Sequence, residues 1–170
     1  RFEFVIIAGM DPSERLPIWS TDDVARRRQE VLCTLVDDTH PLYVDARELF
    51  TPPLSREEVT QLLLTALETY CEIRAVAREL RYLDPIVKND TKGRQKRHPR
   101  LHAVRKHLQA RLEFLENEAD RTLPFTFYRP NAGRRFAAGE GLTMDLIDPV
   151  PDSVVATMFP PVFDFHSQVG

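Results

Sequence analysis

Apolar side chains between residues 59 and 80 recur at alternating steps of four and three positions. This spacing keeps one face of an α-helix apolar over about six turns. A second series with similar steps runs over residues 101–115, and a short basic connection at residues 88–97 joins the two. Two long amphipathic helices joined in this way predict an antiparallel helical hairpin over residues 55–121. The first series consists of Val59, Leu63, Ala66, Tyr70, Ile73, Ala77 and Leu80.

Local signals predict where these two helices begin and end. Ser55 followed by Glu58 is typical of a capping box, so the first helix is expected to begin after Ser55. Because the residue before a proline is disfavoured in helical geometry, Pro85 predicts that this helix ends at Leu83. Pro99 suits the first turn of the second helix, where its missing N–H costs nothing.

The N-terminal part is predicted to combine an extended segment with a shorter helix. Residues 1–19 are expected to be extended, and their β-branched and aromatic start at residues 2–7 is typical of a strand. Trp19 is expected to anchor this segment to the core. Ser20 predicts the capping box of a helix, whose arginines at residues 26–28 are expected to be solvated or to face an acidic partner.

Residues 124–170 differ from the rest, because they contain six prolines and six phenylalanines and rarely keep a helical period. Such a segment is too apolar for a solvated linker and too rich in proline for a sheet interior. We expect an extended C-terminal arm that lies on the chain's own hairpin or on another subunit. The predicted fold is therefore mainly α: a helical domain at residues 1–123, in which one or two shorter helices pack on the hairpin, and this arm.

The charge of the chain is unevenly distributed. Net charge is −3, yet residues 88–106 hold eight Lys or Arg against one Asp. This tip of the hairpin is expected to contact an acidic protein face or phosphate groups, or to be merely solvated. Nucleic acid is disfavoured as a partner, because residues 84–107 contain no Phe, Tyr or Trp that could stack on bases.

No sequence motif indicates catalysis or a cofactor. His98 and His102 have the spacing of helical metal ligands, but their cationic surroundings repel a dication, so we expect them and His107 to be solvated or to face anions. Cys33 and Cys71 lie among apolar residues, as is typical of buried free thiols in a reducing compartment. Without a nucleotide fingerprint or an activated nucleophile, we expect no enzyme, no cofactor and no metal site.

Three stretches of the hairpin carry a resemblance to a known family. They are Leu-Glu-Thr-Tyr-Cys-Glu at residues 67–72, the turn at Gly93-Arg94, and His98-Pro99 at the start of a leucine-rich helix. Through them residues 55–121 resemble the helical hairpin of phage terminase small subunits. The resemblance implies a nucleic-acid-binding adaptor of a ring-forming DNA-packaging assembly, which we keep as the alternative function.

The leading expectation is a non-catalytic structural or accessory subunit of a larger multiprotein assembly. Long helices and an apolar arm present more apolar surface than 170 residues easily cover, and such surface usually marks an interface. The residues expected to contact other subunits belong to the basic tip, the apolar helix face and the arm: Lys92, Arg94, Lys96, Arg97, Tyr70, Ile73, Phe159, Phe163 and Phe165.

The start of the chain at Arg1 bears on its expected location. A cleaved organellar presequence or a trimmed sequence would explain this start, so a mitochondrial complex is expected, with the cytoplasm as the alternative. No stretch is apolar for long enough to cross a bilayer. The chain could be peripheral to a membrane complex, but it is not expected to be transmembrane itself.

Overall fold

The computed structural model describes residues 10–36, 38–39, 43, 50–91, 98–122 and 150–163. Within these residues the chain is mainly helical and contains no strand, which confirms the predicted fold class. The strand predicted at residues 2–7 lies outside the described residues. The elements are a short 3₁₀ helix η1 (Pro17–Ser20) and the α-helices α2 (Asp22–Leu35), α4 (Arg56–Thr91), α5 (Pro99–Thr122) and α6 (Asp152–Met158).

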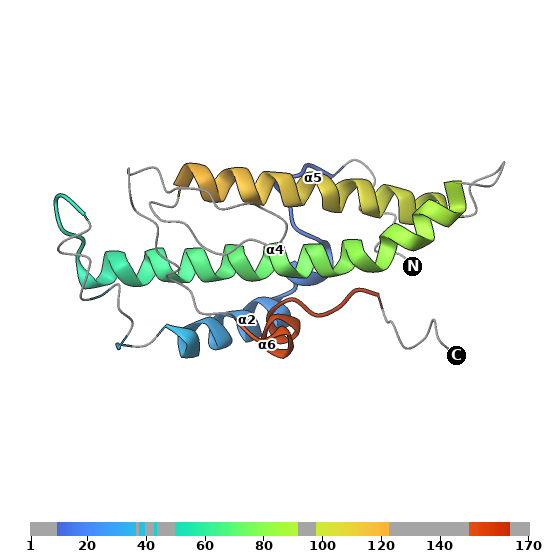
Figure 1. Cartoon of the computed structure of the whole chain (residues 1–170). Helices are drawn as coiled ribbons and strands as arrows, with labels where there is room; N and C mark the ends of the chain where they lie inside the picture. The colour runs from blue at the N-terminus through green and yellow to red at the C-terminus, as the bar shows by residue number, and fades with distance from the viewer. Residues whose placement is uncertain are drawn as a thin grey trace.

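Helices α4 and α5 form the predicted antiparallel hairpin and lie side by side (Figure 1). All seven residues of the first apolar series are buried, and α5 contributes the buried residues Val104, Leu108 and Leu115. The Ser55 capping box is also confirmed. The Glu58 backbone N–H donates to Ser55 Oγ (3.2 Å), and the Ser55 backbone N–H donates to Glu58 Oε1 (3.0 Å).

The predicted end of α4 at Leu83 is wrong, because the helix continues through Pro85 to Thr91. A proline inside a helix removes one backbone hydrogen bond and bends the axis, and α4 does change direction near its C-terminal end (Figure 1). Tyr82, Leu83 and Val87, on both sides of the proline, are buried. We infer that this packing compensates for the lost hydrogen bond.

The cap of α2 also differs from the prediction by one residue. Ser20 belongs to η1, so the next residue, Thr21, becomes the cap, and its Oγ1 accepts a hydrogen bond from the Val24 backbone N–H (3.4 Å). The acidic pair Asp22 and Asp23 lies in the first turn of α2. The positive end of the helix dipole stabilises their negative charges there.

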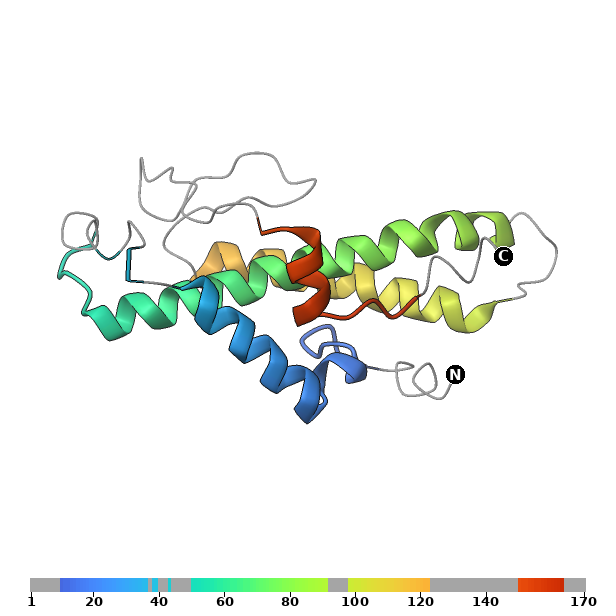
Figure 2. The same cartoon turned by 90° about the horizontal axis from the view of Figure 1, so that it is seen from below.

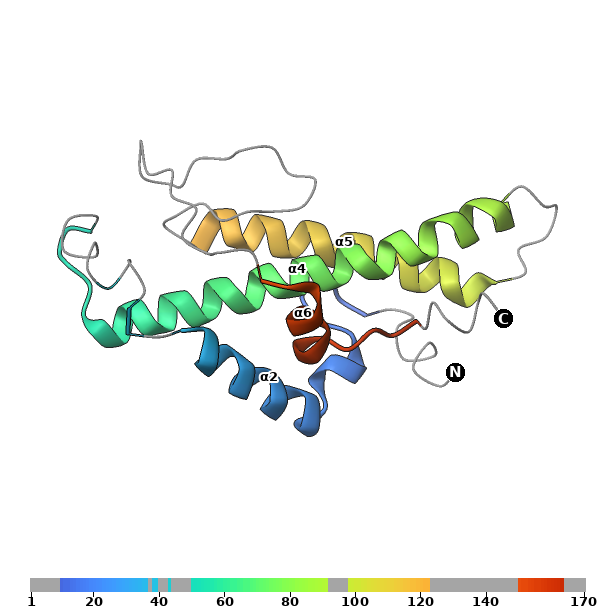
Figure 3. The same ribbon diagram turned by 60° about the horizontal axis from the view of Figure 1, so that its bottom comes forward.

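The helices form three layers with α4 in the middle (Figure 1). Helix α5 covers one side of α4, while α2 and α6 pack on the other side. Figures 2 and 3 show α6 in the angle between α2 and α4. Helix α4 therefore contacts every other α-helix of the described chain.

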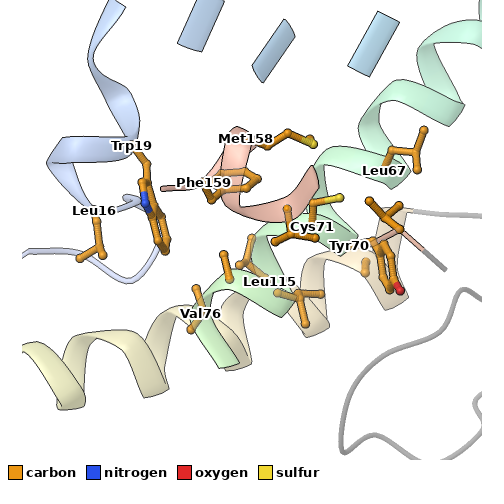
Figure 4. Close-up of a cluster of buried hydrophobic side chains, with 14 of the residues drawn as sticks. Leu16, Trp19, Leu67, Tyr70, Cys71, Val76, Leu115, Met158 and Phe159 are labelled. Carbon is orange, nitrogen blue, oxygen red and sulfur yellow. The ribbon is translucent and has the colours of Figure 1, made fainter. Parts of the chain in front are cut away.

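The arm predicted as extended contains a helix in its described part. Residues 152–158 form α6, which buries Val155 and Met158 against the rest of the chain. Phe159 follows and is completely buried; its ring meets Trp19 edge to face, with 5.3 Å between the ring centroids (Figure 4). The indole N–H of Trp19 donates to the carbonyl oxygen of Pro160 (2.9 Å). Trp19 thus anchors its loop to the core, as predicted.

Replacement of Phe159 by alanine is expected to lower the free energy of unfolding by about 3–5 kcal/mol, because it opens a cavity at the centre of the core. Phe163→Ala provides a matched control, since Phe163 is only half-buried, and should cost about half as much. Urea unfolding of both variants measures the difference. Equal losses for the two variants would contradict a central role for Phe159.

Candidate protein-interaction sites

A buried ion network is centred on Glu72 of α4, whose side chain is 0% exposed. Arg111 of α5 donates from Nε to Glu72 Oε2 (2.7 Å) and from Nη2 to Oε1 (3.0 Å), and Arg15 Nη2 lies 2.8 Å from Oε1. Arg111 Nη1 also donates to the carbonyl oxygens of Pro12 and Ser13 (3.2 and 2.8 Å). This network joins α4, α5 and the loop before η1, and its role is structural.

Arg28 is a second buried cation, which corrects the expectation that residues 26–28 are all solvated. Its Nη1 donates to the carbonyl oxygens of Trp19 (2.9 Å) and Met158 (3.4 Å), and its guanidinium lies 4.8 Å from the centre of the Phe159 ring. Burial lowers the pKa of Arg28. Arg26 and Arg27 are exposed. The burial of Arg28 follows from its packing against Trp19, Met158 and Phe159, which the run of arginines itself does not indicate.

We define the arm cradle as the side chains that bind the backbone of residues 150–163: Trp19, Arg28, Arg74, Arg78 and Glu79. Arg78 Nη2 donates to the carbonyl oxygen of Phe159 (2.8 Å), and Arg74 donates to the carbonyl oxygen of Val150 and pairs with Asp152. Apart from the pair with Asp152, these contacts bind main-chain atoms, so they do not depend on which side chains the arm carries.

Glu79 is the acidic member of the arm cradle, and its side chain is 2% exposed. Its Oε1 accepts hydrogen bonds from the backbone N–H groups of Val162 and Phe163 (3.3 Å each), and its Oε2 lies 2.7 Å from Arg78 Nη2. Burial raises the pKa of Glu79, while Arg78 and the two N–H groups oppose the rise.

The apolar residues predicted to bind partners belong mainly to the chain's own core. Tyr70, Ile73 and Phe159 are covered by the chain itself, so they are core residues rather than partner contacts, which corrects that prediction. Phe163 is half-buried and stacks on Tyr82, with 5.2 Å between the ring centroids. Phe165 lies outside the described residues.

The four basic residues predicted to bind partners, Lys92, Arg94, Lys96 and Arg97, also lie outside the described residues. The flanking helix ends are described. Lys88, Arg100 and Lys106 are exposed there, so the described part of the tip still presents cations to solvent.

Asp90, near the C-terminal end of α4, contacts the start of α5 beside this tip. Its Oδ2 lies 2.8 Å from His102 Nε2 and accepts a hydrogen bond from the His98 backbone N–H (3.2 Å). His102 is half-buried and faces the Asp90 carboxylate, which is one of the two environments expected for it, and His98 is exposed. His107 is not solvated as expected: it is buried, and this burial lowers its pKa. Among the described residues, no group of three or more His, Cys, Asp or Glu side chains could hold a metal ion.

Sequence reasoning missed an apolar groove at the opposite end of the hairpin. Phe50, Leu54 and Leu62 form its apolar lining, and the groove has a volume of about 740 Å³. Its polar rim consists of Glu57, Glu58, Gln61, Thr65 and Thr122. The signal was the run of three leucines at residues 62–64, of which only Leu63 belongs to the apolar series. Leu62 and Leu64 therefore indicate that the first turns of α4 carry apolar surface outside the face that the series defines.

Comparisons of the chain with protein-family models, with curated proteins and with solved structures found no match. A separate search of the described helices found none that combines the length and the apolar character needed to cross a membrane. Any proposal for function therefore rests on the geometry of the groove, the arm cradle and the charged ends of the hairpin.

The two cysteines are expected to differ sharply in reactivity. Both are free, but Cys33 is exposed, which corrects its predicted burial, whereas Cys71 is buried and has its pKa raised by burial to about 12. A thiol-specific reagent at pH 8 should modify Cys33 rapidly and Cys71 only as the chain unfolds, since the thiolate is the nucleophile. A Cys33→Ser variant should show only the slow reaction; rapid modification of that variant would contradict the buried position of Cys71.

Acidification is expected to stabilise the wild type relative to a Glu79→Gln variant. Between the raised pKa of folded Glu79 and its ordinary value of 4.5, the folded state binds more protons than the unfolded state. The free energy of unfolding therefore rises as pH falls through this window. Urea unfolding between pH 8 and pH 5 measures the difference between the two proteins, with the exposed Glu30→Gln variant as control. A pH-independent difference would be inconsistent with the raised pKa.

Proposed function

We propose that this chain is a non-catalytic structural subunit of a larger multiprotein assembly. The observation that carries the proposal is the open apolar groove formed by Phe50, Leu54 and Leu62. Apolar surface gains roughly 25 cal/mol for each Å² removed from water, so a partner that covers the groove is stabilised by contact with it. Concentrated apolar surface of this kind is typical of protein–protein interfaces.

The buried charged residues support a scaffold role. Glu72 and Arg111 bind each other and the loop before η1, while Arg28 and Glu79 bind the backbone of the C-terminal arm. Breaking such a buried pair typically costs 3–5 kcal/mol. Their described contacts therefore account for their burial, because each one fixes one part of the chain against another.

The two ends of the hairpin differ in charge, which supports contacts with more than one partner. Lys88, Arg100 and Lys106 are exposed at one end, whereas the groove end presents the exposed Glu57 and Glu58. Electrostatic complementarity mainly determines which partner binds and in which orientation. A subunit that contacts different neighbours at each end fits this distribution.

The native mass of the particle that contains the chain tests the proposal. We expect a tagged chromosomal copy to elute in a particle that is far larger than its own monomer and that contains other proteins. The same measurement on mitochondrial and cytosolic fractions tests the predicted mitochondrial location. A monomer in both fractions would overturn the proposed function.

The alternative function, a nucleic-acid-binding adaptor, is favoured by the resemblance of residues 55–121 to phage terminase small subunits and by the exposed cations at the tip of the hairpin. Duplex DNA binding, compared between the wild type and a variant with reversed charges at Lys92, Arg94, Lys96 and Arg97, distinguishes the two functions. For a protein-binding subunit, duplex DNA should not bind the wild type measurably near physiological salt. For an adaptor, wild-type binding should be micromolar or tighter and should fall by about one log unit per log unit of salt for each phosphate neutralised.

A further inference from the structure

We infer that the apolar groove binds a basic amphipathic helix of a partner protein. The inference rests on the proposed function, because it names the chemistry of one partner of the assembly. Three features of the described residues carry it: the apolar lining of the groove, the helix surface that α5 leaves uncovered, and the acidic surroundings.

The position of the groove favours a helical partner. Helix α5 ends at Thr122, while the first turns of α4 extend beyond this end of α5 (Figure 1). Thr122 lines the groove together with residues 57–65, so the groove lies where the packing of α5 on α4 stops. Among the described residues, no helix covers the ridges of side chains on α4 that a longer α5 would pack against. A partner helix can continue that packing with apolar anchors at i, i+3, i+4 and i+7.

The charge around the groove favours a basic partner. Glu57 and Glu58 lie on the rim of the groove and are exposed.

The nearby cations are engaged with other groups. Arg56 packs over the Tyr43 ring at 4.6 Å and pairs with Asp38. Arg121 pairs with Glu118 at 2.7 Å. Among the described residues, the exposed Glu57 and Glu58 are therefore the acidic groups of the groove rim, and their charge attracts Lys and Arg on a partner and repels phosphate groups.

Binding of model peptides to the full chain tests the inference. The probe is a fluorescent 14-residue peptide with leucine at i, i+3, i+4 and i+7 and lysine on its opposite face; the control carries glutamate in place of lysine. We expect the basic peptide to bind at least about tenfold more tightly, and to bind more weakly as salt increases, because the rim charges are complementary. Equal binding of the two peptides, or no binding of either, would overturn the inference.

Two groove variants and one control locate the contact. Leu62→Ser removes an apolar contact and Glu57→Lys reverses a rim charge, and each should weaken binding of the basic peptide by about tenfold. Glu30→Lys makes the same charge change on the exposed surface of α2 and should leave binding unchanged. Thermal melts confirm that each variant is folded. An equal loss in Glu57→Lys and Glu30→Lys would assign binding to the overall charge and overturn the inference.

Two other results would show that the groove binds something other than a partner helix. If only a Phe125→Ala/Phe127→Ala variant bound the peptide, the groove would belong to the chain's own residues 123–128. If ultracentrifugation showed self-association that Leu62→Ser abolished, it would belong to a second copy. Either result overturns the basic-helix partner but leaves the proposed function standing, since that function is refuted only by a monomeric native particle.

Discussion

The bidentate ion pair between Glu72 and Arg111 is the interaction on which the rest of the structure depends. It joins the two helices of the hairpin at a site closed to solvent, and the same arginine holds the carbonyl oxygens of Pro12 and Ser13. A buried carboxylate is tolerated only when its oxygens are paired and hydrogen-bonded. The network therefore requires α4, α5 and the loop before η1 to take their positions together, and it restricts the register in which the hairpin can close.

Helix α4 contacts every other α-helix of the described residues, and on the side of the arm several of its polar contacts bind backbone atoms. Arg74, Arg78 and Glu79 hold the arm on one side, while Glu72 faces the opposite helix. Side-chain groups that bind a backbone satisfy donors and acceptors that would otherwise be buried without partners. This explains how residues 150–163, in which Asp152–Met158 form a helix, can cross the apolar core.

Local patterns predicted the parts of the fold that local interactions decide. The periodicity over residues 59–80 and the Ser55–Glu58 capping box depend on neighbours within one or two turns, so they were visible in the sequence. The passage of α4 through Pro85 and the burial of Arg28 depend on packing against distant residues. The same holds for the groove, because it exists only where α5 ends beside the first turns of α4. The predicted partner residues Tyr70 and Ile73 show the same limit: an apolar helix face does not reveal whether the chain itself covers it.

The contact between Trp19 and Phe159 has a consequence for how the chain folds during synthesis. The Trp19 indole bonds a carbonyl 141 positions later in the chain, so this part of the core cannot close until residue 160 has left the ribosome. Closing so long a loop is slow and entropically costly. Until then the hairpin can form, but the apolar site that Phe159 later fills stays open to water. Such intermediates are prone to aggregation, so the nascent chain has an interval in which a chaperone would protect it.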